Sequence, residues 1–157
     1  MHCTPSFASW RLPEIITLVP IIGMLGWIVH GYEHYNTPTP ASVLTLFVVS
    51  VLALIWALAT FMVYGFIERN ALLTACIDFC FVVTFIAGVC ELSDIALTDC
   101  TLFQQVVVTS SFTFRPLGYG DNIEKSCNMV KASFALGIVN TIFFGFTCVC
   151  IGTLPPF

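Results

Sequence analysis

The longest apolar run of the chain, residues 41–67, decides which kind of fold is possible. It reads ASVLTLFVVSVLALIWALATFMVYGFI, and the phenol of Tyr64 is its only ionisable side chain. An α-helix rises about 1.5 Å per residue, so roughly 20 apolar residues cross the ~30 Å hydrocarbon layer of a bilayer. The run therefore predicts a transmembrane helix with length to spare for tilt.

Composition extends this interpretation to the whole chain of 157 residues, because 58% of them are hydrophobic and 9% are charged. A soluble domain usually carries about a quarter charged residues. The length suits one compact membrane domain, residues 1–157, and excludes a separate soluble catalytic domain. The net charge of -4 without a basic cluster gives no indication of a nucleic-acid partner.

Hydropathy and turn residues predict four spans joined by short connectors, except for one loop at residues 91–128 between the third and fourth spans. Short connectors allow only antiparallel neighbours, so we expect an all-α membrane protein with a four-helix, up-down-up-down transmembrane bundle. Residues 1–11 form a polar lead, and β-branched residues at 103–114 allow a short strand or hairpin within the loop. The expected spans are residues 12–32, 41–67, 71–90 and 129–154.

Asp78 is the one acid that falls well inside a predicted span. A carboxylate there costs at least a few kcal/mol unless it is neutralised or paired, so it is a candidate functional residue. A structural hydrogen bond to a nearby polar group is the favoured interpretation, and proton or ion transport is the alternative. The polar groups expected at similar depth are Thr17, Thr60, Tyr64 and Thr147.

Other ionisable residues of the first span, Glu14, His30, Glu33 and His34, lie near its ends, where they are expected to reach water. His30 and His34 have metal-compatible spacing but no third strong ligand nearby, so no metal site is predicted. The sequence contains no nucleophile elbow, phosphate-binding loop or acid pair. We therefore expect a non-enzyme without catalytic residues or cofactors.

Two cysteines of the loop region, Cys100 and Cys127, are candidates for a disulfide. In an oxidising compartment, closing a loop of roughly 27 residues would stabilise the fold by about 3 kcal/mol. The alternative is two thiols on a cytosolic loop in the opposite orientation, and lysine and arginine counts do not decide the orientation. Four further cysteines lie within the spans and are interpreted as buried apolar groups: Cys76, Cys80, Cys148 and Cys150. A thiol oxidoreductase is the weaker hypothesis.

Small residues inside the spans predict close helix packing, because they let helix backbones approach in lipid. Packing within the bundle is the simpler interpretation, and oligomerisation or docking onto another membrane protein is the alternative. The candidate packing positions are Gly23, Gly26, Ala53, Ala57, Ser133 and Gly137.

Residues 124–146, EKSCNMVKASFALGIVNTIFFGF, together with Asp99-Cys100, resemble the loop and last-helix pattern of fungal tetraspan proteins of the MARVEL family. This resemblance implies cytoplasmic termini, a lumenal or external loop, and residence in the plasma membrane or an endomembrane. It also implies a role in organising membranes or other membrane proteins, without catalysis.

We therefore expect a non-catalytic membrane organiser or accessory subunit that contacts lipids, a larger membrane protein or further copies of itself. The alternative is a small transporter or channel with a buried polar path around Asp78.

Overall fold

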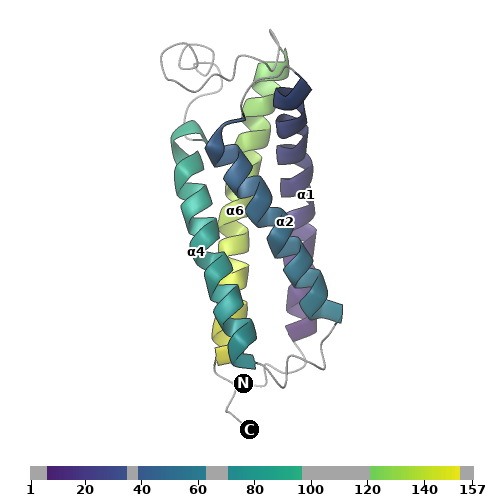
Figure 1. Ribbon diagram of the computed structural model, residues 1–157, viewed down its shortest axis with the longest axis vertical. Coiled ribbons are helices and arrows are strands. Elements are labelled where there is room, and N and C mark those ends of the chain that lie inside the picture. Colours follow the sequence, from purple (N-terminus) through teal and green to yellow (C-terminus); the bar gives the residue numbers. More distant parts are fainter. Residues whose placement is uncertain (1–6, 35–38, 63–70, 97–120, 153–157) are drawn as a thin grey trace.

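The computed structural model describes residues 7–34, 39–62, 71–96 and 121–152, and nearly all of them are helical. They form four α-helices, and these stretches contain no β-strand (Figure 1). The helices are α1 (Phe7–His34), α2 (Ala41–Met62), α4 (Ala71–Ala96) and α6 (Asp121–Gly152).

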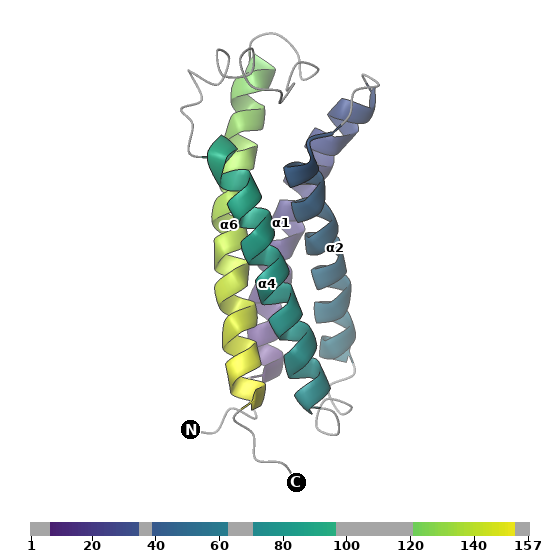
Figure 2. The ribbon, with the colours of Figure 1, turned by 60° about the vertical axis from the view of Figure 1, so that its left-hand side comes forward.

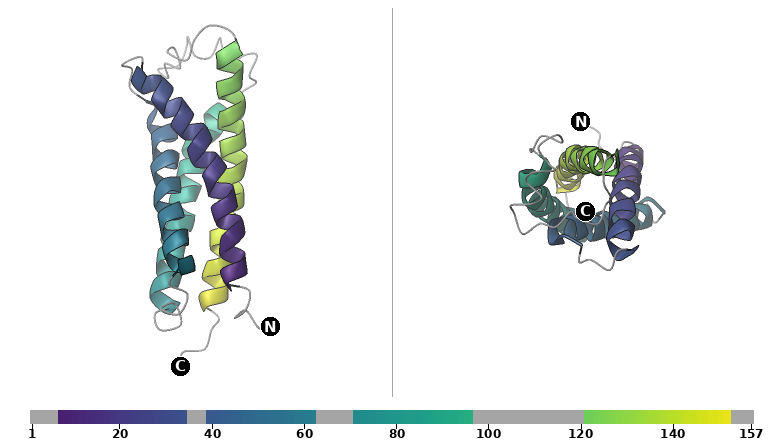
Figure 3. Two further views of the ribbon diagram at one scale, coloured as in Figure 1. Left: turned by 90° about the vertical axis from the view of Figure 1, so that its right-hand side faces the viewer. Right: turned by 90° about the horizontal axis from the view of Figure 1, so that it is seen from above.

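The four helices form a ring in the order α1, α2, α4, α6, as the view along the long axis shows (Figure 3). The most extensive contact is between α4 and α6, and α2 and α4 make the least extensive of the four neighbouring contacts. Each helix therefore has a helical neighbour on two sides and presents the remaining side outward.

Contacts between side chains show which helix ends lie together. Glu14 near the start of α1 meets Thr147 near the end of α6, and Asp78 near the start of α4 meets Trp56 in the last third of α2. The contact of Arg11 with Asp78 joins the two pairs, so the starts of α1 and α4 and the ends of α2 and α6 lie at the same end of the bundle, the lower end in Figure 2.

Each helix is long and apolar enough to cross a membrane, which confirms the expected integral membrane protein. The candidate spans are Trp10–His34, Ala41–Met62, Leu72–Ser93 and Lys125–Cys150. Large apolar side chains cover the outside of every helix, including Ile16, Ile55, Phe79 and Ile142, all more than half exposed. Such an outer surface suits hydrocarbon and would be unstable in water.

Inward-facing side chains recur at helical spacing of three or four residues, which is the pattern of a helix with one buried face. On α1 they are Leu18, Ile21, Leu25, Ile28 and Tyr32, and on α2 they are Ser42, Val43, Leu46, Ser50, Ala53, Ala57 and Thr60. Together with residues of α4 and α6, the apolar members form one continuous core.

Two glycines let neighbouring helices pack closely, Gly137 between α6 and α4 and Gly88 between α4 and α2. A Cβ built on Gly137 of α6 would lie 2.9 Å from Cγ2 of Val89, and one on Gly88 of α4 would lie 3.3 Å from Cδ1 of Leu46. Gly88 was not among the packing positions predicted from the sequence. A Cβ at Gly137 would require Val89 to shift, and one at Gly88 would require Leu46 to move by a few tenths of an ångström.

The other predicted packing positions divide into inward and outward ones. Ala53, Ala57 and Ser133 are buried within the bundle, and Gly26 faces the ring of Phe47 on α2. Gly23 is different, because no heavy atom lies within 4 Å of a Cβ built there. Its helix face is therefore open on the outside of the bundle.

The helix bounds differ from those expected from hydropathy. α1 begins at Phe7 within the expected polar lead, α4 continues to Ala96 and α6 begins at Asp121, so the outer parts of the expected 91–128 loop are helical. Polar residues continue a helix beyond its apolar section when their backbone bonds are kept and their side chains reach the bundle end. In α6, for example, the side chain of Lys125 packs on α1, with Nζ 5.5 Å from the ring centre of Trp27.

Several predictions fall outside the described residues. The possible strand at 103–114, the rest of the loop between residues 97 and 120, Tyr64 and the end of the expected second span at 63–67 all lie there.

We predict that Gly137→Leu lowers the free energy of unfolding by about 1–3 kcal/mol, because the new side chain collides with Val89. The measurement is the thermal unfolding midpoint of the purified chain in mild detergent. Gly145→Leu on the same helix is the matched control, because nothing lies within 4 Å of its Cβ position. Equal midpoints for the two variants would contradict the assigned α4–α6 contact.

Candidate functional site

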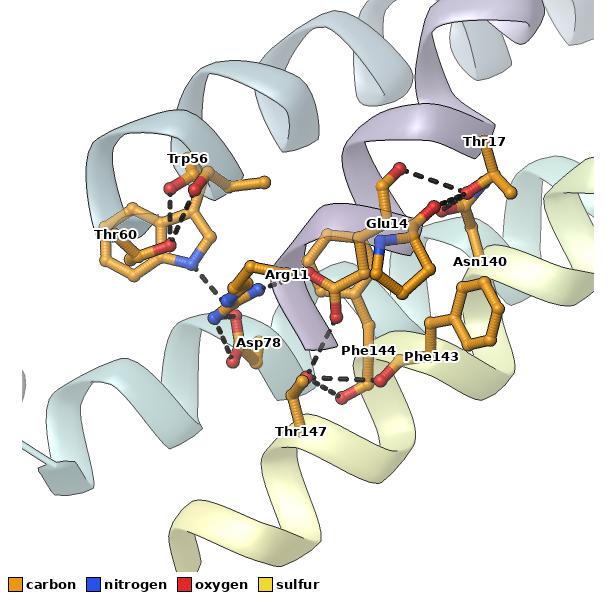
Figure 4. Close-up of polar contacts among 12 residues, drawn as sticks. Arg11, Glu14, Thr17, Trp56, Thr60, Asp78, Asn140, Phe143, Phe144 and Thr147 are labelled. Carbon is orange, nitrogen blue, oxygen red and sulfur yellow. Dashed lines mark hydrogen bonds and ion pairs between the residues drawn. The ribbon is translucent and has the colours of Figure 1, made fainter. Parts of the chain in front are cut away.

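A buried ion-paired cluster joins α1 to α4 inside the bundle. Arg11 donates from Nη2 to both carboxylate oxygens of Asp78, at 2.9 and 2.7 Å, and from Nη1 to Oε2 of Glu14 at 2.8 Å. All three side chains are fully buried. Because α1 and α4 lie on opposite sides of the ring, the arginine side chain crosses the interior to reach Asp78 (Figure 4).

The other two helices each add a hydrogen-bonding side chain to this charge cluster, which we define as Arg11, Glu14 and Asp78. The indole Nε1 of Trp56 on α2 donates to Oδ1 of Asp78 at 2.9 Å. The hydroxyl of Thr147 on α6 lies 3.3 Å from Oε1 of Glu14. All four helices therefore meet at the charge cluster.

Local sequence places the two cluster residues of α1 on one side of the helix. Residues three apart lie on the same helix face, so Arg11 and Glu14 form an i,i+3 ion pair. Asp78 is six residues beyond the start of its span at Leu72, which corresponds to about 9 Å of helix. The charge cluster thus lies in the outer third of the bundle, near the starts of α1 and α4.

A second polar contact joins α1 and α6 one turn further along α1. The hydroxyl of Thr17 lies 3.0 Å from Oδ1 of Asn140, and the amide nitrogen of Asn140 donates to the backbone carbonyl of Leu136 at 3.1 Å. Thr17 also lies within 3.0 Å of the carbonyls of Pro13 and Glu14, so its polar atoms are satisfied within the bundle.

Aromatic rings cover the charge cluster on the side of the bundle centre. Phe144 has its ring 5.7 Å from the guanidinium carbon of Arg11, a distance typical of a cation–π contact. Phe81 and Phe85 of α4 pack on Phe144, with ring centres 5.5 and 5.9 Å away. Beyond these rings the interior contains mainly aliphatic side chains, among them Ile21 and Leu25.

The buried polar residues expected from the sequence are only partly brought together. Asp78 is a member of the charge cluster and Thr147 contacts Glu14 of that cluster, whereas the hydroxyl of Thr60 bonds to the backbone carbonyls of Trp56 and Ala57 in its own helix. All three are buried.

Two predictions about charged residues are wrong. Glu14 was expected to reach water, but its side chain is fully buried and bonded, and Arg11 was assigned to a polar lead outside the membrane. Asp78 consequently has partners, Arg11 and Trp56, that hydropathy did not assign to it. One sequence feature could have indicated this burial, namely an arginine and a glutamate three residues apart at the start of a span. Such a pair lies on one helix face and can be buried together.

Six of the eight cysteines lie in the described helices. Cys76, Cys80, Cys90 and Cys148 are free thiols, and Cys148 donates from Sγ to the carbonyl of Ala75 at 3.4 Å. Cys76 and Cys80 are exposed on the outside of α4, which differs from the buried thiols expected from hydropathy. Cys127 is buried, and its predicted disulfide partner Cys100 lies outside the described residues, so this bridge stays a prediction. Within the four described helices no three His, Cys, Asp or Glu residues form a group that could hold a metal ion.

Comparison with protein-family models, with curated proteins and with solved structures gives no match to this chain. The fold and the charge cluster therefore define it only by class: an integral membrane protein built on four long apolar helices around a buried ion-paired cluster.

We predict that Asp78→Leu lowers the free energy of unfolding by roughly 3–5 kcal/mol, because it leaves a buried guanidinium without its main anion. Phe79→Leu, at the adjacent outward position, is the control and should change it by less than about 0.5 kcal/mol. Denaturant unfolding in mixed micelles measures both values. A similar small loss in both variants would show that the ion pair does not hold α1 to α4.

Proposed function

We propose that this chain is a non-catalytic membrane organiser or accessory subunit that acts through lateral contacts of its helices with lipids, another integral membrane protein or further copies of itself. The proposal includes an up-down-up-down crossing of the membrane, cytoplasmic termini and a long loop on the other side. It also retains the MARVEL family as the proposed relationship, on the resemblance of residues 124–146 and of Asp99-Cys100.

The observation that carries this proposal is the division of the chain's polar and apolar groups. Three charged side chains within the spans, Arg11, Glu14 and Asp78, bond to one another in the interior, whereas the outward faces carry large apolar side chains. An interior engaged in its own ion pairs supports a structural role for these charges. The outward apolar faces are then the part of the molecule that can meet lipids and other helices.

The outer face of α1 is the best-supported place for a helix contact. Gly23 forms a notch there, with nothing within 4 Å of its Cβ position. Exposed Val19 on one side and Trp27 on the other flank this notch. A small residue between large ones lets a second helix approach closely, which is how membrane helices associate without a hydrophobic driving force.

We expect Gly23→Leu to reduce recovery of the native complex several-fold without changing the unfolding midpoint of the chain. The complex is purified in mild detergent, its particle mass is measured and its protein components are quantified by mass spectrometry. Gly145→Leu, at an open position on α6, is the matched control. A wild-type particle with the mass of one chain in its detergent shell, or undiminished recovery for Gly23→Leu, would contradict the proposed α1 contact.

Transport is the competing proposal, and one observation favours it: three ionisable side chains lie together within the bundle. The rings of Phe144, Phe81 and Phe85 separate this charge cluster from the rest of the interior, which favours the structural role. A transport mechanism would need these rings to move so that water could reach both ends of the path.

The flux of protons or monovalent cations into liposomes that contain the purified chain distinguishes the two proposals. We expect wild type and Asp78→Asn to give the same flux as empty liposomes, because the aromatic rings close the path. A wild-type flux that Asp78→Asn abolishes would establish transport instead. Phe79→Leu, at an outward position, is the control for the reconstitution itself.

A further inference from the structure

The charge cluster contains one more acid than base. Arg11 is its cation, and Glu14 and Asp78 are both bonded to it, so ionisation of both carboxyls would leave a net charge of -1 in the interior. An uncompensated charge is strongly unfavourable in a medium of low polarity. Lys125 and Lys131, the other described basic side chains besides the histidines, lie in the first half of α6, toward the opposite end of the bundle.

The hydrogen bonds of the two carboxyl groups are unequal. Asp78 receives three short N–H contacts, two from Nη2 of Arg11 and one from Trp56. Glu14 receives one N–H contact, from Nη1 of Arg11 to Oε2. Donors stabilise the ionised form of an acid, so this distribution favours Asp78 as the carboxylate.

The surroundings of the second oxygen of Glu14 suit a proton on it. Thr147 has one hydroxyl hydrogen, and its Oγ1 lies 2.9 Å from the carbonyl of Phe144 and 3.2 Å from that of Phe143. With its hydrogen on the closer carbonyl, the hydroxyl presents a lone pair to Oε1 of Glu14 at 3.3 Å. A protonated Oε1 would then donate to Thr147. An ionised Oε1 could accept the hydroxyl hydrogen, but only over 3.3 Å and in place of the shorter bond to the carbonyl of Phe144.

We propose that Glu14 is a proton-binding site: it is a neutral carboxylic acid in the folded protein and holds the one proton that balances the charge cluster. The proton is on Oε1, Oε2 accepts from Arg11, and Asp78 is the anion. Among the described residues, the ionisable groups that face Glu14 are Arg11 on its own helix and Asp78 on α4, with the thiol of Cys148 near Asp78 on α6. From α2, the neutral indole of Trp56 completes the surroundings. This assignment is independent of the proposed lateral contacts.

Infrared spectroscopy of the full chain in lipid at neutral pH tests this assignment, because a protonated carboxyl has a carbonyl stretch of its own. We expect this band in the wild type, a shift to lower frequency when glutamate carboxyls carry ¹³C, and no shift with ¹³C-labelled aspartate. We also expect its loss in Glu14→Gln and its retention in Glu33→Gln, a change at an exposed glutamate of the same helix. A missing band, or one that follows the aspartate label, would overturn the proposal.

Stability gives a second measurement. Glutamine is a close match for a neutral acid here, because its carbonyl can accept from Arg11 and its amide can donate to Thr147. Glu14→Gln should therefore unfold within a few degrees of Glu33→Gln in the same detergent. A much lower midpoint for Glu14→Gln would show that Glu14 acts as a carboxylate, and the proposal would be wrong.

Discussion

The ion pair between Arg11 and Asp78 is the interaction on which the rest of this bundle depends. It joins two helices on opposite sides of the ring, and its atoms are fully buried. In the membrane, helices gain little from apolar contact with each other, because lipid tails offer the same contact. A buried charge pair is specific in a way that apolar packing is not, since a displaced helix would leave an unpaired charge in hydrocarbon. The pair therefore fixes how α1 and α4 are positioned, and Trp56 and Thr147 connect α2 and α6 to the same place.

The rest of the bundle is arranged around this polar layer by packing. Phe144 covers Arg11, and the rings of Phe81 and Phe85 extend the apolar contact toward the centre. Further along, Gly88 and Gly137 bring α2, α4 and α6 close together. One end of the molecule is thus held by charge and hydrogen bonds, and the middle is held by the fit of apolar side chains.

Hydropathy predicted the four membrane helices, because an apolar stretch of sufficient length has few other stable structures in a chain of this composition. It placed the helix ends less well, since α1, α4 and α6 each include polar residues beyond their apolar sections. Hydropathy also placed Arg11 in a polar lead and Glu14 in contact with water, and both predictions were wrong. A charge near the end of an apolar run is usually solvated, and a single sequence does not show that an acid on a distant helix lies opposite.

By itself, the sequence determined that this protein is made of membrane helices and that Asp78 needs a partner, and it offered the small residues of the spans as candidate packing positions. These properties depend on the chemistry of each segment and on the cost of leaving polar groups in lipid. Only the tertiary structure decided that the partner is Arg11, that Glu14 joins them, and that Gly137 faces inward while Gly23 faces outward. The physical reason is that the partner of each charged residue and the direction of each helix face depend on the rotation and order of the helices around the ring. Contacts between residues far apart in the chain set that rotation and order.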